Sequence, residues 1–599
     1  MKDEAAHGAS SFILHPSYLP SFMTPARRLL HYFARYRTRL ILGALCVVGS
    51  AGFSLLKPLI VGNAVNELGR GFTRGMLVKY GVMLIGAAAV EGAFLYLQRS
   101  IIIGVSRLIE YDMRNDFYGH LQKLPVKFYH QHRTGDLMSR ATNDLGAVRM
   151  LIGPAVMHSL SSLLVVVGAF SMMMRIETKM ALMSLIAIPV VAGLVSFFGQ
   201  RIHLRFRSVQ DYFGDISARV QENLAGVRVV RAFTQEDNEL ATFKRMNREY
   251  VERNRSLIRL TAMFYPSLHA LIGIMFVIIF YLGTRRIVGG TLNLGDFVAF
   301  QFYLGRMIWP LIAMGWVINL FQRGMASMKR LNEIWTAAPE VDGAETADRK
   351  PHGDLEIRNL TFAYEDRATL RDINLTVPHG ETIGIVGRTG SGKSTLLSLL
   401  TRTYEAPPNT IFIDGRALET IPRHQVREWI GMVPQETFLF SDSIAENVRF
   451  GRGGATDDDI DASAALAGLG PDVASFPNGL HTVIGERGIT LSGGQKQRTA
   501  IARALVRDPL ILILDDSLSA VDTQTEERIL NALRTIREGR TVLIVSHRVS
   551  SVKDADHIIV LEDGRIVERG THEALIAKGG YYADLYRRQT IEAELEEIA

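Results

Sequence analysis

The sequence predicts a multidomain membrane protein, in which an all-α domain of six transmembrane helices with long cytoplasmic helical extensions precedes an α/β domain. Three observations support this fold class. Six apolar segments are long enough to cross the roughly 30 Å core of a bilayer as helices. Two of the connections between these segments keep helical periodicity for more than forty residues. Beyond residue 353, short β-rich runs alternate with helices, which is typical of a largely parallel sheet.

Composition excludes several classes of protein. The chain has 599 residues, more than one domain holds, and its 47% apolar and 21% charged residues exclude an intrinsically disordered protein. Its single cysteine, Cys46, excludes an internal disulfide and a cysteine-based metal site. The net charge of +6 could indicate nucleic-acid binding. The basic residues gather beside the apolar segments, however, so membrane topology explains them better and no nucleic-acid partner is expected.

The amino-terminal part, residues 1–39, is expected to hold a tail without a signal peptide and an interfacial elbow helix. Between Pro25 and Arg39 the pattern is basic and amphipathic, as in a helix that lies in the cytoplasmic membrane interface.

The transmembrane domain is predicted over residues 40–335. Its spans are expected at about 40–64, 78–104, 151–174, 180–200, 262–284 and 297–320. Basic residues concentrate between spans two and three and between spans four and five, which puts both connections in the cytosol. An even number of spans then leaves both chain ends on the cytosolic side. Each of these connections contains one short interruption, at 128–140 and 222–233.

Charged side chains inside the spans are candidates for function, because a charge in the bilayer is costly and usually faces a cavity or a helix bundle. Glu91 in span two and Arg306 in span six are the candidates for a substrate pathway. An intramembrane ion pair, or a contact to a partner subunit, explains them equally well.

A linker is expected at 336–353, an α/β domain at 354–589 and an acidic tail at 590–599. The strand 382–386 runs into a glycine-rich loop and then a helix, which is the setting of a phosphate-binding P-loop. We expect ATP to bind here, with Lys393 at the β- and γ-phosphates and Ser394 on Mg²⁺. The predicted ATP-binding residues of the loop are Gly387, Arg388, Thr389, Gly390, Ser391, Gly392, Lys393, Ser394 and Thr395.

Further motifs follow in a specific order, and the most specific is Leu491-Ser492-Gly493-Gly494-Gln495. With this motif and the six spans, the chain resembles a half-transporter of the type-1 (type IV fold) ABC exporters, and its second domain resembles an ABC ATPase. The resemblance implies that Tyr364 stacks on adenine, that Gln435 and Asp515 join Ser394 around Mg²⁺, and that His547 contacts the γ-phosphate. It also implies that the residues coupling the two domains include Gly135, Asp136, Gly226 and Glu486.

In this family the signature residues, Leu491–Gln495, contact ATP held by the opposite nucleotide-binding domain. A chain with one such domain must therefore work as a dimer, with a second ABC half-transporter as its partner.

The sequence departs from the family at Asp516, where the catalytic base is normally glutamate. Aspartate is one methylene shorter, which withdraws the carboxylate from the attacking water. Either Asp516 works adequately in a slow homodimer, or this chain supplies the degenerate site of a heterodimer. We favour the heterodimer, because the signature motif is intact and because residues 303–316 resemble heterodimeric multidrug exporters.

The expected function is ATP-driven efflux of hydrophobic or amphipathic compounds, of the multidrug type, across the cytoplasmic (inner) membrane. The chain is expected to be an ATPase coupled to transport, a translocase. The alternatives are a homodimeric lipid or lipid-A-type flippase, an ATP-gated channel or regulator, and a soluble ATPase, which would lack the six spans.

Overall fold

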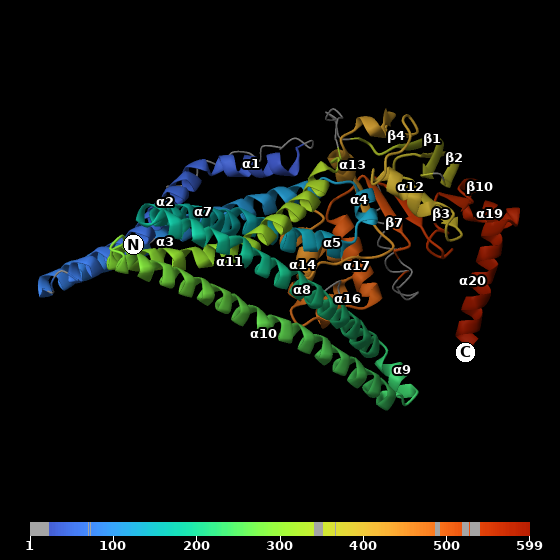
Figure 1. Cartoon of the computed structure of the whole chain (residues 1–599). Helices are drawn as coiled ribbons and strands as arrows, with labels where there is room; N and C mark the ends of the chain where they lie inside the picture. Colours follow the sequence, from blue (N-terminus) through green and yellow to red (C-terminus); the bar gives the residue numbers. More distant parts are fainter. Residues whose placement is uncertain are drawn as a thin grey trace. The chain divides into compact units, whose positions relative to one another are not determined.

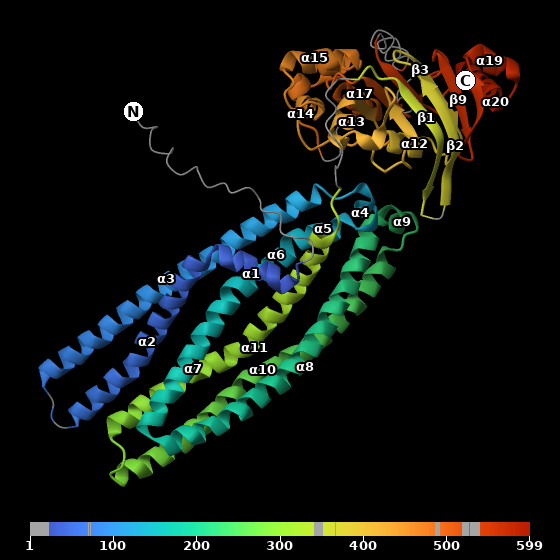
Figure 2. The ribbon, with the colours of Figure 1, turned by 90° about the horizontal axis from the view of Figure 1, so that it is seen from above.

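The computed structural model describes residues 23–69, 71, 73–340, 351–365, 367–485, 491–517, 526 and 539–598. The chain forms two compact units (Figures 1 and 2). The first contains the chain up to Leu124 and His132–Pro339, and the second contains Pro125–Gln131 and the chain from Glu340 onward. The short segment that interrupts the first unit therefore belongs with the second.

The first unit is helical. Among the described residues, six helices or helical runs are long and apolar enough to cross a membrane, which confirms the six predicted spans. Several continue far beyond their apolar segments, as α10 does with a total length of 53 residues, so the predicted helical extensions are also present. The helices are α1 (Pro25–Arg35), α2 (Arg37–Leu68), α3 (Arg74–Leu121), α5 (Thr134–Ser139), α6 (Leu145–Met150), α7 (Val156–Ile176), α8 (Thr178–Ala225), α9 (Val227–Ala232), α10 (Glu236–Val288) and α11 (Leu294–Thr336).

The third span is one helical run, Thr134–Ile176. Two π-helical turns, η1 (Arg140–Asp144) and η2 (Leu151–Ala155), join α5, α6 and α7 within it. In the folded unit α2 lies alongside α3, and α8 lies alongside α10 (Figure 2).

Proline interrupts five of the six spans. It lies inside α2, η2, α8, α10 and α11, as Pro58, Pro154, Pro189, Pro266 and Pro310. Each proline removes one N–H from the helical hydrogen-bond ladder and favours a bend there. The second span, α3, is 48 residues long and contains no proline.

The amphipathic helix α1 is tied to two long helices by buried polar contacts. Thr24 caps its first turn. The phenol of Tyr32 donates to Asp116 at 2.6 Å, and that of Tyr36 donates to Asp112 at 2.8 Å, both on α3. On the other side, Arg28 donates to the side-chain oxygen of Asn332 in α11 at 3.0 Å.

The second unit has two sheets. The antiparallel sheet has the order β2-β1-β4-β5, and the six-stranded sheet has the order β10-β9-β3-β8-β7-β6, in which only β10 is antiparallel. This mostly parallel sheet confirms the predicted α/β fold. The strands are β1 (Leu355–Tyr364), β2 (Arg367–Val377), β3 (Thr382–Gly387), β4 (Ile411–Ile413), β5 (Arg416–Ala417), β6 (Ile430–Val433), β7 (Ile511–Asp515), β8 (Thr541–Val545), β9 (His557–Glu562) and β10 (Arg565–Gly570).

Some helices of the second unit pack against these sheets, and others pack against neighbouring helices (Figure 1). The last helix, α20, runs without interruption through position 590, so the predicted acidic tail continues that helix within the described residues. The helices are α4 (Val126–Gln131), α12 (Lys393–Leu400), α13 (Arg423–Trp429), α14 (Ile444–Arg449), α15 (Asp457–Leu466), α16 (Gly470–Ser475), α17 (Gly493–Leu505), α19 (His572–Lys578) and α20 (Tyr581–Ile598).

Candidate functional site

The glycine-rich loop joins the end of β3 to the start of α12 at Lys393. Gly390 and Gly392 have φ values of 84° and 105°, which side chains other than glycine rarely adopt. The ammonium of Lys393 donates to the backbone oxygens of Gly387 at 2.7 Å and Arg388 at 2.9 Å. Burial lowers the pKa of Lys393, against the opposing effect of the nearby acidic residues. A lysine held in this way gains a favourable partner when phosphate enters the loop.

A cavity of about 1010 Å³ opens over this loop. It brings together residues from β1, α12, β7 and the loops after β6 and β8, which are far apart in the sequence. Gly387, Arg388 and Ser391 belong to the same loop but are not part of the lining. The predicted site residues that line the cavity are Tyr364, Thr389, Gly390, Gly392, Lys393, Ser394, Thr395, Gln435, Asp515, Asp516 and His547.

Asp515, the last residue of β7, is buried in this cavity. Burial raises the pKa of its carboxyl, while a hydrogen bond with the Ser394 side chain and the charge of Lys393 partly oppose that increase. The buried carboxylate therefore has a cation and a hydroxyl near it, at the place where the phosphate loop ends.

Asp516 follows with a left-handed backbone, at a φ of 44°. One of its carboxylate oxygens accepts from the side-chain amide of Gln435 at 3.4 Å, and the other lies 3.5 Å from the backbone nitrogen of His547. Two residues from separate loops, Gln435 and His547, thus contact the shortened carboxylate.

Gln589 of α20 holds the His547 segment in place, a role that the sequence did not suggest. Its side chain donates to the backbone oxygen of His547 at 2.7 Å and accepts from the backbone nitrogen of Val549 at 2.8 Å. No motif precedes Gln589, and it lies 42 positions from His547.

Tyr364, at the end of β1, belongs to an aromatic cluster. The centroid of its ring lies 5.0 Å from those of Phe362 and Tyr404, in edge-on geometry. Tyr404 continues the cluster, because its phenol hydrogen-bonds Nδ1 of His130 in α4 at 2.9 Å. We call Tyr364, which is predicted to stack on adenine, the base platform. The sequence analysis did not identify Tyr404 or His130 as possible neighbours of it.

The signature segment forms the start of α17. The hydroxyl of Ser492 accepts from the backbone nitrogen of Gln495, whose side chain in turn accepts from the backbone nitrogen of Ser492 at 2.9 Å. This capping box fixes the first turn and leaves Ser492 exposed. Among the described residues, the lining of the nucleotide cavity includes none of Leu491–Gln495.

The residues predicted to couple the domains come from different elements. Gly135 and Asp136 lie in α5 of the first unit, where Asp136 pairs with Arg140 at 2.9 Å. Gly226 separates α8 from α9. Glu486 lies outside the described residues.

Glu91 and Arg306 line a second cavity, of about 880 Å³, between α2, α3, α7 and α11. Glu91 forms an ion pair with Lys57, and a guanidinium nitrogen of Arg306 lies 3.9 Å from its other oxygen. The two candidates thus take part in an intramembrane charge cluster and also face a cavity.

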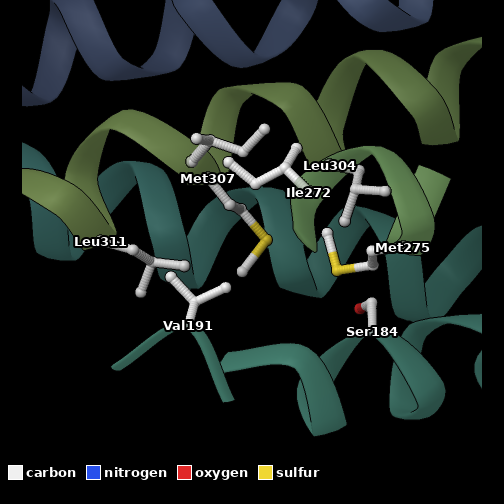
Figure 3. Close-up of a pocket in the computed structure, with 8 residues that line it drawn as sticks. Ser184, Val191, Ile272, Met275, Leu304, Met307 and Leu311 are labelled. Carbon is white, nitrogen blue, oxygen red and sulfur yellow. The ribbon is translucent and has the colours of Figure 1, made fainter. Parts of the chain in front are cut away.

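A third cavity, between α8, α10 and α11, is much smaller, at about 30 Å³ (Figure 3). The side chains of Met275, Met307 and Leu304 converge on it. The hydroxyl of Ser184 donates to the backbone oxygen of Ala181 at 2.6 Å, which leaves the lining apolar. This void has room for little more than a water molecule, whereas the 880 Å³ cavity is large enough for an organic ligand.

Comparison with known proteins identifies both units. Residues 40–311 match the family of the ABC transporter transmembrane region, and residues 370–519 match the ABC transporter family. The chain is 38% identical to the probable multidrug resistance ABC transporter ATP-binding/permease protein YheI of Bacillus subtilis, over 94% of this chain and 97% of that protein. It is 37% identical to the multidrug resistance-like ATP-binding protein MdlA of Escherichia coli, over 95% and 97%.

A solved bacterial Atm1-family ABC exporter with ATP bound is also similar. Its TM-score is 0.76 at 26% identity, over 93% of this chain and 99% of that one. Two family domains in this order, relatives matched along almost their whole length and a full-length structural match agree with the nucleotide cavity and the six spans. The chain is therefore a half-transporter of the type-1 ABC exporter family, a multi-pass membrane protein with a cytosolic, ATP-hydrolysing domain.

Proposed function

We propose that this chain is the degenerate-site half of a heterodimeric exporter, which uses ATP to expel hydrophobic or amphipathic compounds across the cytoplasmic (inner) membrane. Two relatives with multidrug-resistance names and the 880 Å³ cavity of the first unit support this choice of cargo. The observation that carries the heterodimer is Asp516, in the place of the usual glutamate.

Asp516 is a poor general base in this position. Its left-handed backbone and its contacts to Gln435 and the His547 backbone hold the short carboxylate back among protein groups. General-base assistance contributes about 10²–10⁴-fold to a reaction, and a displacement near 1 Å can forfeit much of it. Nucleotide bound here would then serve mainly to keep the two domains closed.

A partner is also needed to complete the site. The described lining of the nucleotide cavity contains the phosphate loop but no residue of Leu491–Gln495. Ser492 lies exposed at the start of α17, and the N-terminus of a helix suits a γ-phosphate. We infer that this segment completes the site of a partner subunit, and that the partner's equivalent completes the site of this chain.

The residues around the phosphate loop fit a Mg²⁺ ion that arrives with ATP. Asp515, the Ser394 hydroxyl and the Gln435 amide oxygen are the hard oxygen donors that this ion prefers. A cation beside Asp515 also relieves the cost of burying its charge, which the raised pKa reports. The ion would neutralise charge on the β- and γ-phosphates, while Lys393 binds them and Tyr364 stacks on the base.

The experiment that tests the heterodimer compares ATP hydrolysis by the purified chain alone with hydrolysis by the chain paired with a half-transporter that has glutamate at the corresponding position. We expect feeble turnover alone and at least tenfold faster turnover in the pair. Removing the signature of this chain, with Ser492→Ala, should slow the pair, because it damages the competent site. Brisk turnover by the chain alone would reject the heterodimer.

Transport tests the proposed role of Glu91. We expect Glu91→Gln to change the export of at least some substrates, because it alters the charge of the cavity. Unchanged export of every substrate tested would remove Glu91 from the substrate pathway. The alternative of a homodimeric lipid flippase is favoured by one observation, the excess of basic over acidic side chains around this cavity.

A further inference from the structure

The cavity of the first unit carries more positive than negative charge. Its charged lining residues are Glu91 and Arg99 from α3 and Arg306 from α11, and Lys57 of α2 pairs with Glu91 beside them. Three cations thus accompany one carboxylate. His158 of α7 is the remaining titratable side chain in the lining, and it packs edge-on against Trp316 at 5.4 Å.

The single carboxylate is already occupied. Lys57 holds one oxygen of Glu91 in direct contact, and the other oxygen lies 3.9 Å from Arg306, longer than a charge-assisted hydrogen bond. Arg306 therefore keeps most of its hydrogen-bonding capacity, and its side chain is 39% exposed. Arg99, which is exposed, forms no ion pair with any residue that the structure describes.

The remaining lining suits the body of an amphipathic molecule. Tyr96 and Trp309 are 72% and 70% exposed and lie on the same two helices as the arginines. Serine hydroxyls supply neutral hydrogen-bond donors between them: Ser50, Ser54, Ser100, Ser161 and Ser162. Ser50 is tied to Gln98 at 3.0 Å, which fixes part of this polar wall.

We propose that this cavity binds an amphipathic anion, with its negative group at Arg99 and Arg306 and its apolar or aromatic body against Tyr96 and Trp309. Uncompensated cations are costly within a membrane, and an anionic ligand supplies the missing charge. The carboxylate of Glu91 then competes with the bound anion for the nearby cations, which limits the affinity for anions and allows release. The proposal names the cargo class of the exporter function proposed above and rests on that function.

The test uses the full chain in phosphatidylcholine nanodiscs without nucleotide. The probes are pyrenebutanoate and pyrenebutyltrimethylammonium, which share one apolar body and carry opposite charges. Pyrene fluorescence is titrated with protein, and empty nanodiscs are subtracted. The binding assay contains no ATP, so it does not depend on transport. If the chain showed no ATP-dependent transport, the efflux proposal would fail, but the binding assay would still show whether the cavity binds an anion.

We expect the chain to bind the anion at least tenfold more tightly than the cation. Arg99→Gln and Arg306→Gln should each weaken anion binding about tenfold, and Glu91→Gln should tighten it. Arg259→Gln is the matched control, because it removes one exposed positive charge from α10, away from the cavity lining. It should leave both affinities unchanged.

Three results would overturn the proposal. One is preferential binding of the cation that Glu91→Gln abolishes. Another is anion affinity that neither arginine variant changes. The third is loss of assembly with the partner in the arginine variants while probe affinity stays constant, which would show that the arginines pair with an acidic group of the partner.

A second arm separates two sources of the anion. Nanodiscs that contain phosphatidylglycerol should weaken pyrenebutanoate binding by competition if the site takes lipid headgroups, and this effect should vanish in Arg306→Gln. If pyrenebutanoate binds equally well in both lipids, the site takes free amphipathic anions. Either result supports an anion site, provided that the arginine variants reduce binding.

Discussion

The phenol oxygen of Tyr404 lies 2.9 Å from Nδ1 of His130, although 274 positions separate the two residues. The same tyrosine ring packs against Tyr364, which lines the nucleotide cavity. His130 lies in α4, the short helix that leaves the membrane unit and belongs to the nucleotide-binding unit. A chain of two contacts therefore connects the predicted base platform with the segment that leads back into the membrane helices.

Removing the Tyr404 hydroxyl should weaken this connection without damaging nucleotide binding. In Tyr404→Phe the ring that contacts Tyr364 remains, so ATP affinity should stay within about twofold. One hydrogen bond contributes about 0.5–1.5 kcal/mol, so substrate stimulation of ATP hydrolysis in the assembled transporter should fall between about twofold and tenfold. His130→Ala should have the same effect, and the double variant should add nothing further. Additive losses would mean that the two residues act separately.

Lengthening Asp516 should restore catalysis. Asp516→Glu returns the methylene that the carboxylate lacks, and ATP hydrolysis by the chain should rise at least tenfold, within the roughly 10²–10⁴-fold range of general-base assistance. The left-handed backbone, at a φ of 44°, suits aspartate better than glutamate. The free energy of unfolding should therefore fall by up to about 1 kcal/mol. Asp516→Asn provides the matched control and should show no gain in rate. Equal rates for the glutamate and asparagine variants would contradict the role assigned to this carboxylate.

The raised pKa of Asp515 predicts that its charged carboxylate lowers the stability of the nucleotide-free protein, although the same charge is needed to bind Mg²⁺ with ATP. The folded state holds this proton more tightly than the unfolded state does, so the group stabilises the fold below its unfolded pKa of about 3.8. That contribution is lost as pH rises through the folded pKa. At pH 7 without nucleotide, Asp515→Asn should therefore raise the melting temperature. The stabilisation that Mg-ATP adds to the wild-type protein should disappear in the variant, and a variant that keeps it would argue against Asp515 as a metal ligand.

Tyr32 should stabilise the amphipathic helix α1. Its ring is 1% exposed and its hydroxyl donates to Asp116, so Tyr32→Phe deprives that carboxylate of a partner at a cost of about 1–3 kcal/mol. Thermal unfolding of the full chain in detergent measures this loss. Tyr36→Phe removes a similar bond to Asp112 from a less buried position and should cost less. An equal or larger loss in Tyr36→Phe would show that burial does not control these contacts.

The sequence predicted best what depends on short stretches of chain. The phosphate loop follows from local requirements, since a buried strand, glycines with positive φ and a helix start lie within about a dozen residues. The spans follow from hydropathy, but their cytoplasmic ends do not. Helices such as α3 and α10 continue beyond their apolar segments because no proline interrupts the hydrogen-bond ladder in those extensions, and apolar composition does not indicate where they end.

Contacts between distant segments could not be predicted in this way. The partners of Glu91 and of the His547 backbone, Lys57 and Gln589, come from other helices and belong to no motif. The same holds for Arg99, because its place in the same cavity as Arg306 depends on how α3 and α11 pack. A single sequence contains the residues of such contacts but not the pairing.

The uninterrupted second span has a mechanical consequence. At 1.5 Å per residue, the 48 residues of α3 form a rod about 72 Å long whose hydrogen-bond ladder has no missing N–H. The other five spans each contain a proline, where flexing costs less. When the membrane helices rearrange, bending should concentrate at those five prolines, while α3 moves as a rigid helix. The spacing between Arg99 and Glu91, eight residues apart on α3, would then stay fixed. Arg306, four residues before Pro310 on α11, would move relative to both.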